Sequence, residues 1–244
     1  ANLALNNKNA ALAESILNNR NKVDSYMPFP MLDYELGDAK MKRLDYSAVL
    51  YFKRFVNTYK GNFYIKDAYL SLAYCAYLQG NTQEAEQYKE LIKTKWKAES
   101  DADKQALKAA KKTNFPHKEI LKARLMNDGG YHQEALTLLL QIPQNTLSSA
   151  DKLEFMYRIG RVYDDLGQDE NALKFYGYTL NQGRSSTEYF AARAALQSGY
   201  IYEKRGDKQK AIQFFQTVLD LDDHEYKNSL DQRAKSGINR IKGL

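Results

Sequence analysis

The stretch that decides the fold reads Met156-x2-Ile159-Gly160-x2-Tyr163, then Gly167, then Ala172-x3-Tyr176. It is followed by a second copy, Ala195-x2-Ser198-Gly199-x2-Tyr202, then Gly206, then Ala211-x3-Phe215. Every position keeps its spacing, and Ala211 lies 39 residues after Ala172. A small/large pattern of fixed period predicts a helix-hairpin repeat. The chain is therefore expected to be all-α, an array of antiparallel helix hairpins.

Weaker copies of this pattern lie nearer the N-terminus. The second-helix alanines are Ala48, Ala85, Ala135, Ala172 and Ala211, with steps of 37, 50, 37 and 39 residues. The paired small residues of the first helices are Gly37, Ala73, Ala123, Gly160 and Gly199. One copy departs from the pattern, because Lys89 replaces the expected aromatic residue. The steps predict five units, with an insertion inside the step of 50 residues.

Each position of the repeat has a packing role. Small residues at Gly160 and Gly199 let the two helices of a hairpin approach, so a bulkier side chain there should cost roughly 1–3 kcal/mol by overpacking. The glycines at positions 80, 130, 167 and 206 suit the left-handed residue that ends a helix. Asn81 and Asp207 follow two of these turns and are expected to cap the next helix.

The segments outside the five units divide the chain further. Residues 1–30 are expected to hold one amphipathic helix or a tight hairpin and a linker broken by two prolines, and no completed repeat fits before Met31. Units one and two occupy residues 31–94, and a spacer helix, opened by Ser100 and rich in lysine near its end, fills residues 95–116. Units three to five occupy residues 117–223. Residues 224–244 should form a helix that caps the last hairpin, with Leu230, Ala234, Ile238 and Ile241 in one stripe.

Composition excludes several classes of protein. Hydrophobic residues make up 43% of the 244 residues and charged residues 27%, as in a folded chain. No apolar run approaches the ~20 residues that cross a bilayer. Residues 1–19 lack the pattern of a signal peptide, although the chain does not begin with Met and a removed targeting segment stays open. Cys75 is expected to be a small core residue.

The repeat positions resemble the tetratricopeptide repeat, whose signature is Trp-x2-Leu-Gly-x2-Tyr, a Gly turn, Ala-x3-Phe and a final Pro. Met156 and Ala195 depart from the Trp position, and Arg184 and Asp223 from the Pro position. The resemblance covers about residues 31–223 and implies a right-handed superhelix of hairpins. The strings at 64–69, 102–107 and 224–230 look like a group of bacterial cell-envelope tetratricopeptide proteins without a clear biochemical assignment. That similarity implies an exported protein.

In the resembling family, the first helix of each hairpin lines a concave groove. Carrying its inward positions over predicts a partner-binding face at Tyr34, Asp38, Tyr74, Tyr77, Arg124, Asn127, Tyr157, Arg161, Asp164, Tyr200 and Glu203. Tyrosine offers contact area at low entropy cost, and arginine pairs with carboxylates. The competing interpretation is that these are ordinary helix residues or internal ion pairs, such as Arg161 with Asp164 or Asp165. The carboxylate clamp of some relatives is not expected, because Tyr34 and Asp38 replace the Lys and Asn that it needs.

No catalytic or metal-binding set stands out. The three histidines are scattered, and His224-Glu225 lacks the second histidine of the helical zinc motif, since Asn228 holds that position. No phosphate loop or nucleophile elbow is present. The sequence therefore predicts no metal, no cofactor and no enzymatic activity, unless a catalytic domain lies outside the chain.

Two functions remain in competition. The leading one is a non-catalytic protein-interaction scaffold that holds an extended peptide or a partner helix in the groove. The alternative is binding of a polyanion, RNA or an acidic glycan, with stacking by Trp96. Its basic residues around the insertion are Lys93, Lys95, Lys97, Lys104, Lys108, Lys111 and Lys112. The net charge of +6 is mild, and Glu99, Asp101 and Asp103 dilute this patch, which disfavours nucleic acid.

Overall fold

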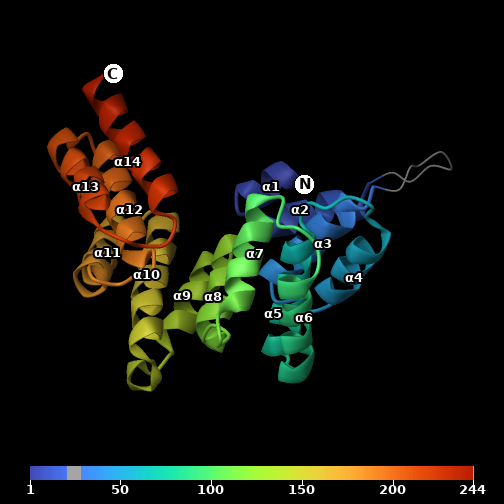
Figure 1. The fold of residues 1–244 in the computed structure, drawn as a ribbon. Helices are drawn as coiled ribbons and strands as arrows, with labels where there is room; N and C mark the ends of the chain where they lie inside the picture. Colours follow the sequence, from blue (N-terminus) through green and yellow to red (C-terminus); the bar gives the residue numbers. More distant parts are fainter. Residues whose placement is uncertain (21–28, 244) are drawn as a thin grey trace. The chain divides into compact units, whose positions relative to one another are not determined.

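The computed structural model describes residues 1–20 and 29–243, and within them the chain is all-helical, without strands. Figure 1 shows the succession of helices along the chain. They are α1 (Asn2–Asn6), α2 (Ala10–Asn18), α3 (Met31–Lys42), α4 (Ala48–Thr58), α5 (Ile65–Leu78), α6 (Thr82–Thr94), α7 (Asp101–Lys111), α8 (Lys118–Asp128), α9 (His132–Leu140), α10 (Ser149–Asp165), α11 (Asp169–Gly183), α12 (Phe190–Lys204), α13 (Lys208–Asp220) and α14 (Lys227–Lys242), with a short 3₁₀ helix at Gln144–Thr146.

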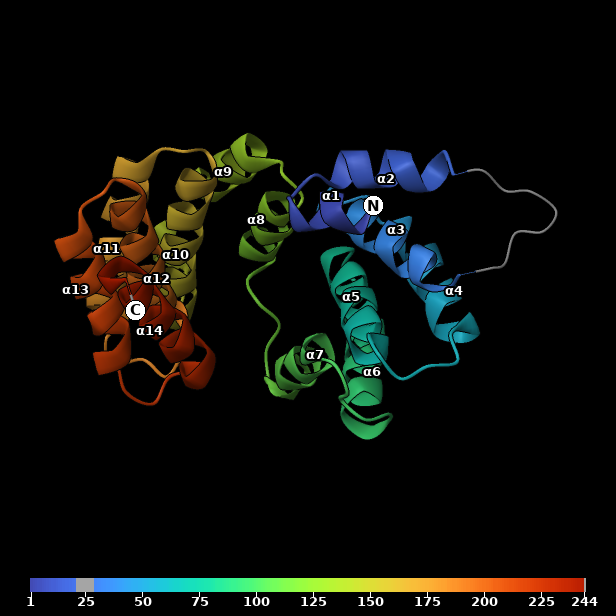
Figure 2. The ribbon, with the colours of Figure 1, turned by 90° about the horizontal axis from the view of Figure 1, so that it is seen from above.

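The chain forms two compact units, residues 1–135 and 136–244. In the N-terminal unit, α3 pairs with α4 and α5 with α6, while α7 packs against both α5 and α6 (Figure 2). The N-terminal residues form a tight hairpin, α1–α2, that packs on α3. In the C-terminal unit, α10 pairs with α11 and α12 with α13, and α14 packs on α13 and α12. Residues 21–28, which belong to the predicted linker, lie outside the described residues.

The turns between paired helices confirm the repeat register. Gly80, Gly130, Gly167 and Gly206 have φ of 88°, 93°, 71° and 78°, the left-handed conformation that favours glycine. The side chains of two following residues cap the next helix as predicted: Asn81 accepts from the backbone of Glu84, and Asp207 from that of Lys210.

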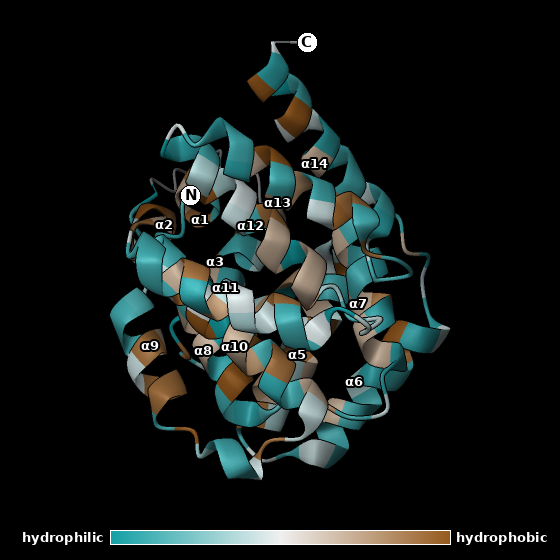
Figure 3. Ribbon diagram, turned by 90° about the vertical axis from the view of Figure 1, so that its left-hand side faces the viewer, coloured by the Kyte–Doolittle hydropathy of each residue, from teal (hydrophilic) through white to brown (hydrophobic). Residues whose placement is uncertain are grey.

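The small residues of the first helices allow close approach. A Cβ atom added to Gly160 would lie 2.7 Å from the Tyr176 ring, and one added to Gly199 would lie 2.5 Å from the Phe215 ring. Both rings are fully buried. Phe215 is also approached from α14, because a Cβ on Gly237 would meet it at 2.6 Å. In the predicted stripe of α14, Leu230 and Ala234 are buried, and hydrophilic residues predominate on the visible side of this helix (Figure 3).

The inserted helix α7 is attached to its neighbours by two buried polar side chains. Ser100 and Asp103 form a capping box at its start, and the carboxylate of Asp103 also accepts from the backbone N–H groups of Tyr64 (2.8 Å) and Lys66 (2.9 Å), which begin α5. At the other end of α7, the Lys89 ammonium donates to the carbonyls of residues 112 and 113, at 3.0 and 3.3 Å. It also lies 4.5 Å from the centroid of the Phe115 ring. A lysine therefore stands at this repeat position in place of an aromatic residue, because in this unit the side chain binds the backbone carbonyls at the end of the inserted helix α7.

Candidate functional site

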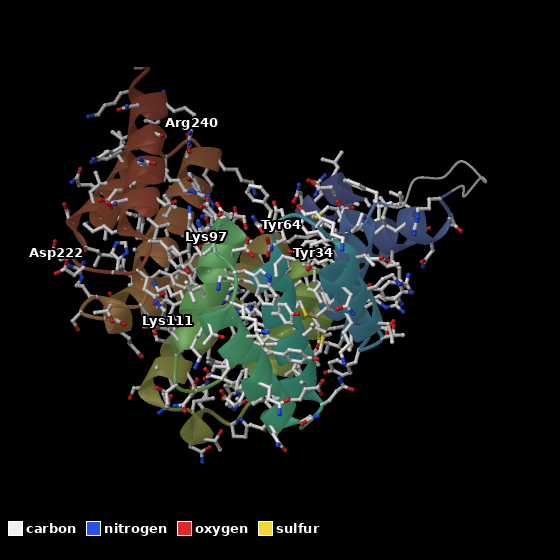
Figure 4. The ribbon with its side chains drawn as sticks, turned by 45° about the vertical axis from the view of Figure 1, so that its right-hand side comes forward. Tyr34, Tyr64, Lys97, Lys111, Asp222 and Arg240 are labelled. Atoms are coloured by element: carbon white, nitrogen blue, oxygen red, sulfur yellow. The ribbon has the colours of Figure 1, made fainter. Side chains whose placement is uncertain are left out.

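The first candidate region lies on α3 and α5 of the N-terminal unit. The hydroxyl of Tyr34 donates to the Asp67 carboxylate at 2.5 Å, and Asp38 accepts from Lys42 at 2.7 Å. Burial raises the pKa of the Asp67 carboxyl to about 6, and the nearby negative charge of Asp38 adds to the shift. Tyr34 also lies against Tyr64, with ring centroids 5.3 Å apart, and Figure 4 shows the two labelled side chains close together. The residues predicted for the binding face did not include Asp67, although Asp67 occupies one of the first-helix positions that line the groove in the resembling family.

The other predicted residues of the N-terminal unit lie on α5 and α8. Tyr74 and Asn127 are buried, at 7% and 5% exposure, so a partner would meet little of their surface. The Arg124 guanidinium lies over the Tyr74 ring, 5.5 Å from its centroid. Tyr77 stacks on Phe115 and donates its hydroxyl proton to the carbonyl oxygen of residue 116 at 3.1 Å. Tyr74 and Tyr77 of α5 thus serve mainly to pack α8 and the segment that follows α7.

In the C-terminal unit, the Asp164 carboxylate brings side chains of three helices together. It accepts from Arg161 on its own helix α10 (3.1 Å), from the hydroxyl of Tyr176 on α11 (2.9 Å) and from Gln197 on α12 (3.1 Å). Arg161 also bonds Asp165 at 3.3 Å, which confirms the internal ion pair that competed with partner binding. The Arg161 side chain still keeps 19% of its surface exposed. Gln197 was missed from the sequence because no repeat position marks it.

The remaining predicted residues of this unit are one buried tyrosine and two half-buried residues of α12. Tyr157 is 3% exposed and packs among Tyr176, Tyr189 and Phe190. Tyr200 packs its ring edge to face with a core phenylalanine at 5.3 Å and remains half-buried. Glu203 accepts two bonds of 2.7 Å from Arg240 of α14.

The partly exposed polar groups of the neighbouring helices α10 and α12 are together called the α10–α12 polar surface: Arg161, Asp164, Gln197, Tyr200 and Glu203. Its side chains are held in place by the bonds described above, so little rotamer entropy remains to be lost on binding. Its groups can donate and accept hydrogen bonds and form ion pairs.

Among residues 1–20 and 29–243, no group of three or more His, Cys, Asp and Glu side chains is placed to hold a metal ion. In that same part of the chain, no helix is both long enough and apolar enough to cross a bilayer.

Comparison with known proteins gives a family for part of the chain. Residues 153–177 and 192–225 match the sequence model of the tetratricopeptide repeat. No curated protein matches the chain.

Two solved structures are similar in fold. The tetratricopeptide domain of P58(IPK) is 15% identical, with a TM-score of 0.42 over 88% of this chain and 55% of that one, so the chain spans about half its length. The C-terminal part of a tetratricopeptide repeat-containing protein from Cytophaga hutchinsonii is 13% identical, with a TM-score of 0.39 over 97% of both chains.

The matched segments coincide with the α10–α11 and α12–α13 hairpins, in which the glycine turns and the buried Tyr176 and Phe215 occupy the expected positions. These two hairpins of the chain therefore resemble tetratricopeptide repeats in both sequence and packing.

Proposed function

We propose that this chain is a non-catalytic scaffold for protein–protein interaction, which binds an extended peptide or a partner helix along the first helices of its hairpins. The proposal rests on the presence of tetratricopeptide repeats together with the α10–α12 polar surface. The observation that carries it is the Asp164 carboxylate, which holds groups from α10, α11 and α12 in one fixed arrangement.

The expected partner segment is polar, and it pairs with positively and negatively charged side chains of this chain. Arg161 offers a guanidinium to a carboxylate or a backbone carbonyl, and Glu203, the counterpart of Asp164 in the next hairpin, offers a carboxylate to a donor. Tyr200, the counterpart of Arg161, supplies ring surface. The bacterial cell-envelope location stays a prediction of the sequence resemblance.

A photo-crosslinking experiment tests the assignment of the face. Tyr200 on the first helix α12 and Tyr178 on the second helix α11 are each replaced, in separate variants, by the photoreactive residue p-benzoylphenylalanine, which is close to tyrosine in shape. Tyr178 is 46% exposed, so it is at least as accessible as Tyr200 and serves as the matched control.

Irradiation in the source cell should link a protein partner to the Tyr200 variant and not to the Tyr178 variant. Equal linking at both positions, or linking at Tyr178 alone, would contradict binding along the first helices. Circular dichroism of both variants establishes that the fold is retained.

The polyanion alternative has one observation in its favour. Trp96 is 42% exposed, stacks on Tyr69 at a centroid distance of 4.8 Å and lies between the exposed Lys95 and Lys97. Lys104 of the patch is engaged, because it pairs with an acid one turn away at 3.0 Å. Figure 4 labels Lys97 and, at the end of α7, Lys111.

Heparin chromatography tests this alternative. Retention that falls steeply with salt, and that is lost when Lys95 and Lys97 are replaced by glutamine, would support it. Elution of the wild-type chain near physiological salt would contradict it.

A further inference from the structure

One arginine near the start of α12 has no acidic partner. Arg193 is half-buried, and within residues 1–20 and 29–243 its guanidinium makes no hydrogen bond and no ion pair. Burial of a charge costs free energy unless an opposite charge or hydrogen bonds compensate for it. Two arginines of α10 show such compensation, because Arg158 pairs with Glu154 at 2.8 Å and Arg161 with Asp164 at 3.1 Å. In the described part of the chain, Arg193 therefore keeps its donors available for a ligand.

The contacts of its neighbours on α12 place Arg193 beside α10. Four residues before it, Tyr189 lies against the ring of Tyr157 on α10, with centroids 6.1 Å apart. Four residues after it, Gln197 donates to the Asp164 carboxylate of the same helix at 3.1 Å. Residues four apart lie on one face of a helix. Arg193 therefore faces α10 between Tyr157 and Asp164.

The hydroxyl of Tyr157 is a second donor at this place. Tyr157 is 3% exposed, and no group in residues 1–20 and 29–243 accepts a hydrogen bond from its hydroxyl. Burial raises the pKa of this hydroxyl, whereas the positive charges of Arg161, Arg193 and Arg158 lower it, so these guanidiniums lie near the oxygen. Buried polar groups are nearly always hydrogen-bonded. The unused hydroxyl therefore indicates a place for an acceptor from outside the described chain.

The acids nearest to this place are already paired. Asp164 accepts from Arg161 and from two uncharged donors on α11 and α12, and Asp165 also accepts from Arg161. On the preceding turns of α10, Glu154 accepts two bonds from Arg158. These bonds compensate part of the negative charge of the three acids, so an anion can approach Arg193 without meeting an unpaired carboxylate.

The chemistry of the two donors selects a carboxylate as the ligand. A guanidinium binds a carboxylate through two parallel bonds, and hydrogen bonds between ionised groups are roughly twice as strong as neutral ones. The Tyr157 hydroxyl can donate to the same anion. The partner segment of the proposed function continues along α12 past Tyr200, which lies two helical turns beyond Arg193, so the carboxylate belongs to a side chain within the segment.

We propose that an aspartate or glutamate side chain of the bound partner pairs with Arg193 and accepts a hydrogen bond from the hydroxyl of Tyr157. This carboxylate subsite rests on the proposed function, because it lies on the same first helices. It adds an acidic residue to the partner segment, at a position two helical turns away from the contact with Tyr200.

Nuclear magnetic resonance of the isotope-labelled full chain tests the subsite with capped tripeptides. The probe acetyl-Ala-Glu-Ala-amide carries a single carboxylate, and acetyl-Ala-Gln-Ala-amide is its uncharged counterpart. The side-chain Nε–H signal of Arg193, identified by its absence from Arg193→Lys, should shift to saturation with the glutamate peptide and not with the glutamine peptide. Affinity, read from the backbone amide signals of α12, should fall by at least about tenfold in Arg193→Gln and in Tyr157→Phe, since each loses a bond to a charged group.

The controls separate loss of the subsite from loss of the fold. Arg233→Gln, at an exposed arginine of α14, should bind the glutamate peptide like the wild type. Tyr157→Phe should leave the free energy of unfolding nearly unchanged, because the hydroxyl has no partner among the described residues. Weaker binding by this variant at unchanged stability therefore reports the missing hydroxyl alone.

Several outcomes would overturn the proposal. They are an unmoved Arg193 signal, equal shifts with both capped peptides, or undiminished affinity in Arg193→Gln or Tyr157→Phe. A third probe, acetyl-Ala-Ala-Ala with a free C-terminal carboxylate, should bind more weakly than the glutamate peptide, and tighter binding would assign the subsite to a chain end instead. Crosslinking at Tyr200 without peptide binding would contradict the subsite alone, and peptide binding without crosslinking would contradict the scaffold function alone.

Discussion

Replacement of Gly160 by alanine tests the packing of the repeat against a matched control on the same hairpin. The new Cβ would lie 2.7 and 2.8 Å from two carbons of the Tyr176 ring, closer than real Cβ contacts allow. The ring cannot retreat easily, because it is fully buried and its hydroxyl bonds Asp164 at 2.9 Å. Overpacking of this kind costs about 1–3 kcal/mol.

The control is Gly177→Ala on α11. A Cβ at Gly177 would meet no heavy atom within 4 Å, and alanine is favoured over glycine inside a helix by about 1 kcal/mol. Gly177→Ala should therefore stabilise the chain. The same helical gain offsets part of the clash at Gly160, so Gly160→Ala should lower the free energy of unfolding by about 1 kcal/mol relative to the wild type, and by about 2 kcal/mol relative to the control.

Urea unfolding followed by far-ultraviolet circular dichroism measures both changes, with stability taken from the midpoint at unchanged slope. A Gly160→Ala protein as stable as Gly177→Ala would refute the reasoning. It would mean that the two helices separate without loss, so that close approach is not what the glycine provides.

Three further predictions concern the N-terminal unit. The pKa of Asp67 is raised to about 6 in the folded chain, so this carboxyl binds a proton more readily in the folded than in the unfolded chain. Its contribution to the free energy of unfolding should therefore rise by about 1 kcal/mol as pH falls from 7 to 5. The Asp67→Asn side chain can still accept from Tyr34, and this variant should lose that part of the pH dependence of urea unfolding. Asp103→Ala should lower the free energy of unfolding by about 2 kcal/mol or more, because backbone N–H groups at the starts of α5 and α7 lose their acceptor. Amide hydrogen exchange at the start of α5 should then be faster in the variant than in the wild type. Gly130→Ala should unfold at lower urea than Gly80→Ala: both positions have positive φ, but only at Gly130 would a Cβ lie 2.0 Å from a backbone oxygen of the α1–α2 turn. Equal midpoints for the two glycine variants would contradict the last prediction.

Much of the fold follows from the sequence, because the repeat positions are local. Gly160 and Tyr176 lie on adjacent helices of one hairpin, so their spacing alone predicts their contact. The turn glycines and the caps at Asn81 and Asp207 follow from backbone conformation and hydrogen bonding within a few residues. Two matched copies were enough to align the weaker ones.

The features that escaped the sequence depend on contacts between distant segments. Asp103 caps α5, which begins 38 residues earlier, and no pattern within α7 points to that partner. Lys89 departs from the repeat pattern, but the helix end that it binds lies beyond the repeat and is not indicated by that pattern. The choice between one helix and a tight hairpin in residues 1–19 stayed open from the sequence, because Lys8 adopts at the turn a left-handed conformation that sequence patterns assign to glycine.

The candidate site was predictable in outline only. The repeat positions placed Arg161, Asp164, Tyr200 and Glu203 on first helices, where the structure has them partly exposed. They also placed Tyr157 on the binding face, and this side chain is buried by the aromatic residues that follow α11. Burial depends on neighbours in three dimensions, which spacing along the chain does not report.

The environment of Lys89 has a consequence for chemical modification. Its ammonium is bonded to the end of α7 and its side chain is 4% exposed, so an acylating reagent can reach the nitrogen only when α7 moves away from α6. The acylation rate of this lysine, read by mass spectrometry beside that of the exposed Lys104, would therefore report how often the inserted helix detaches while the rest of the unit stays folded. A residue that interrupts the repeat pattern thus becomes an internal probe of local opening.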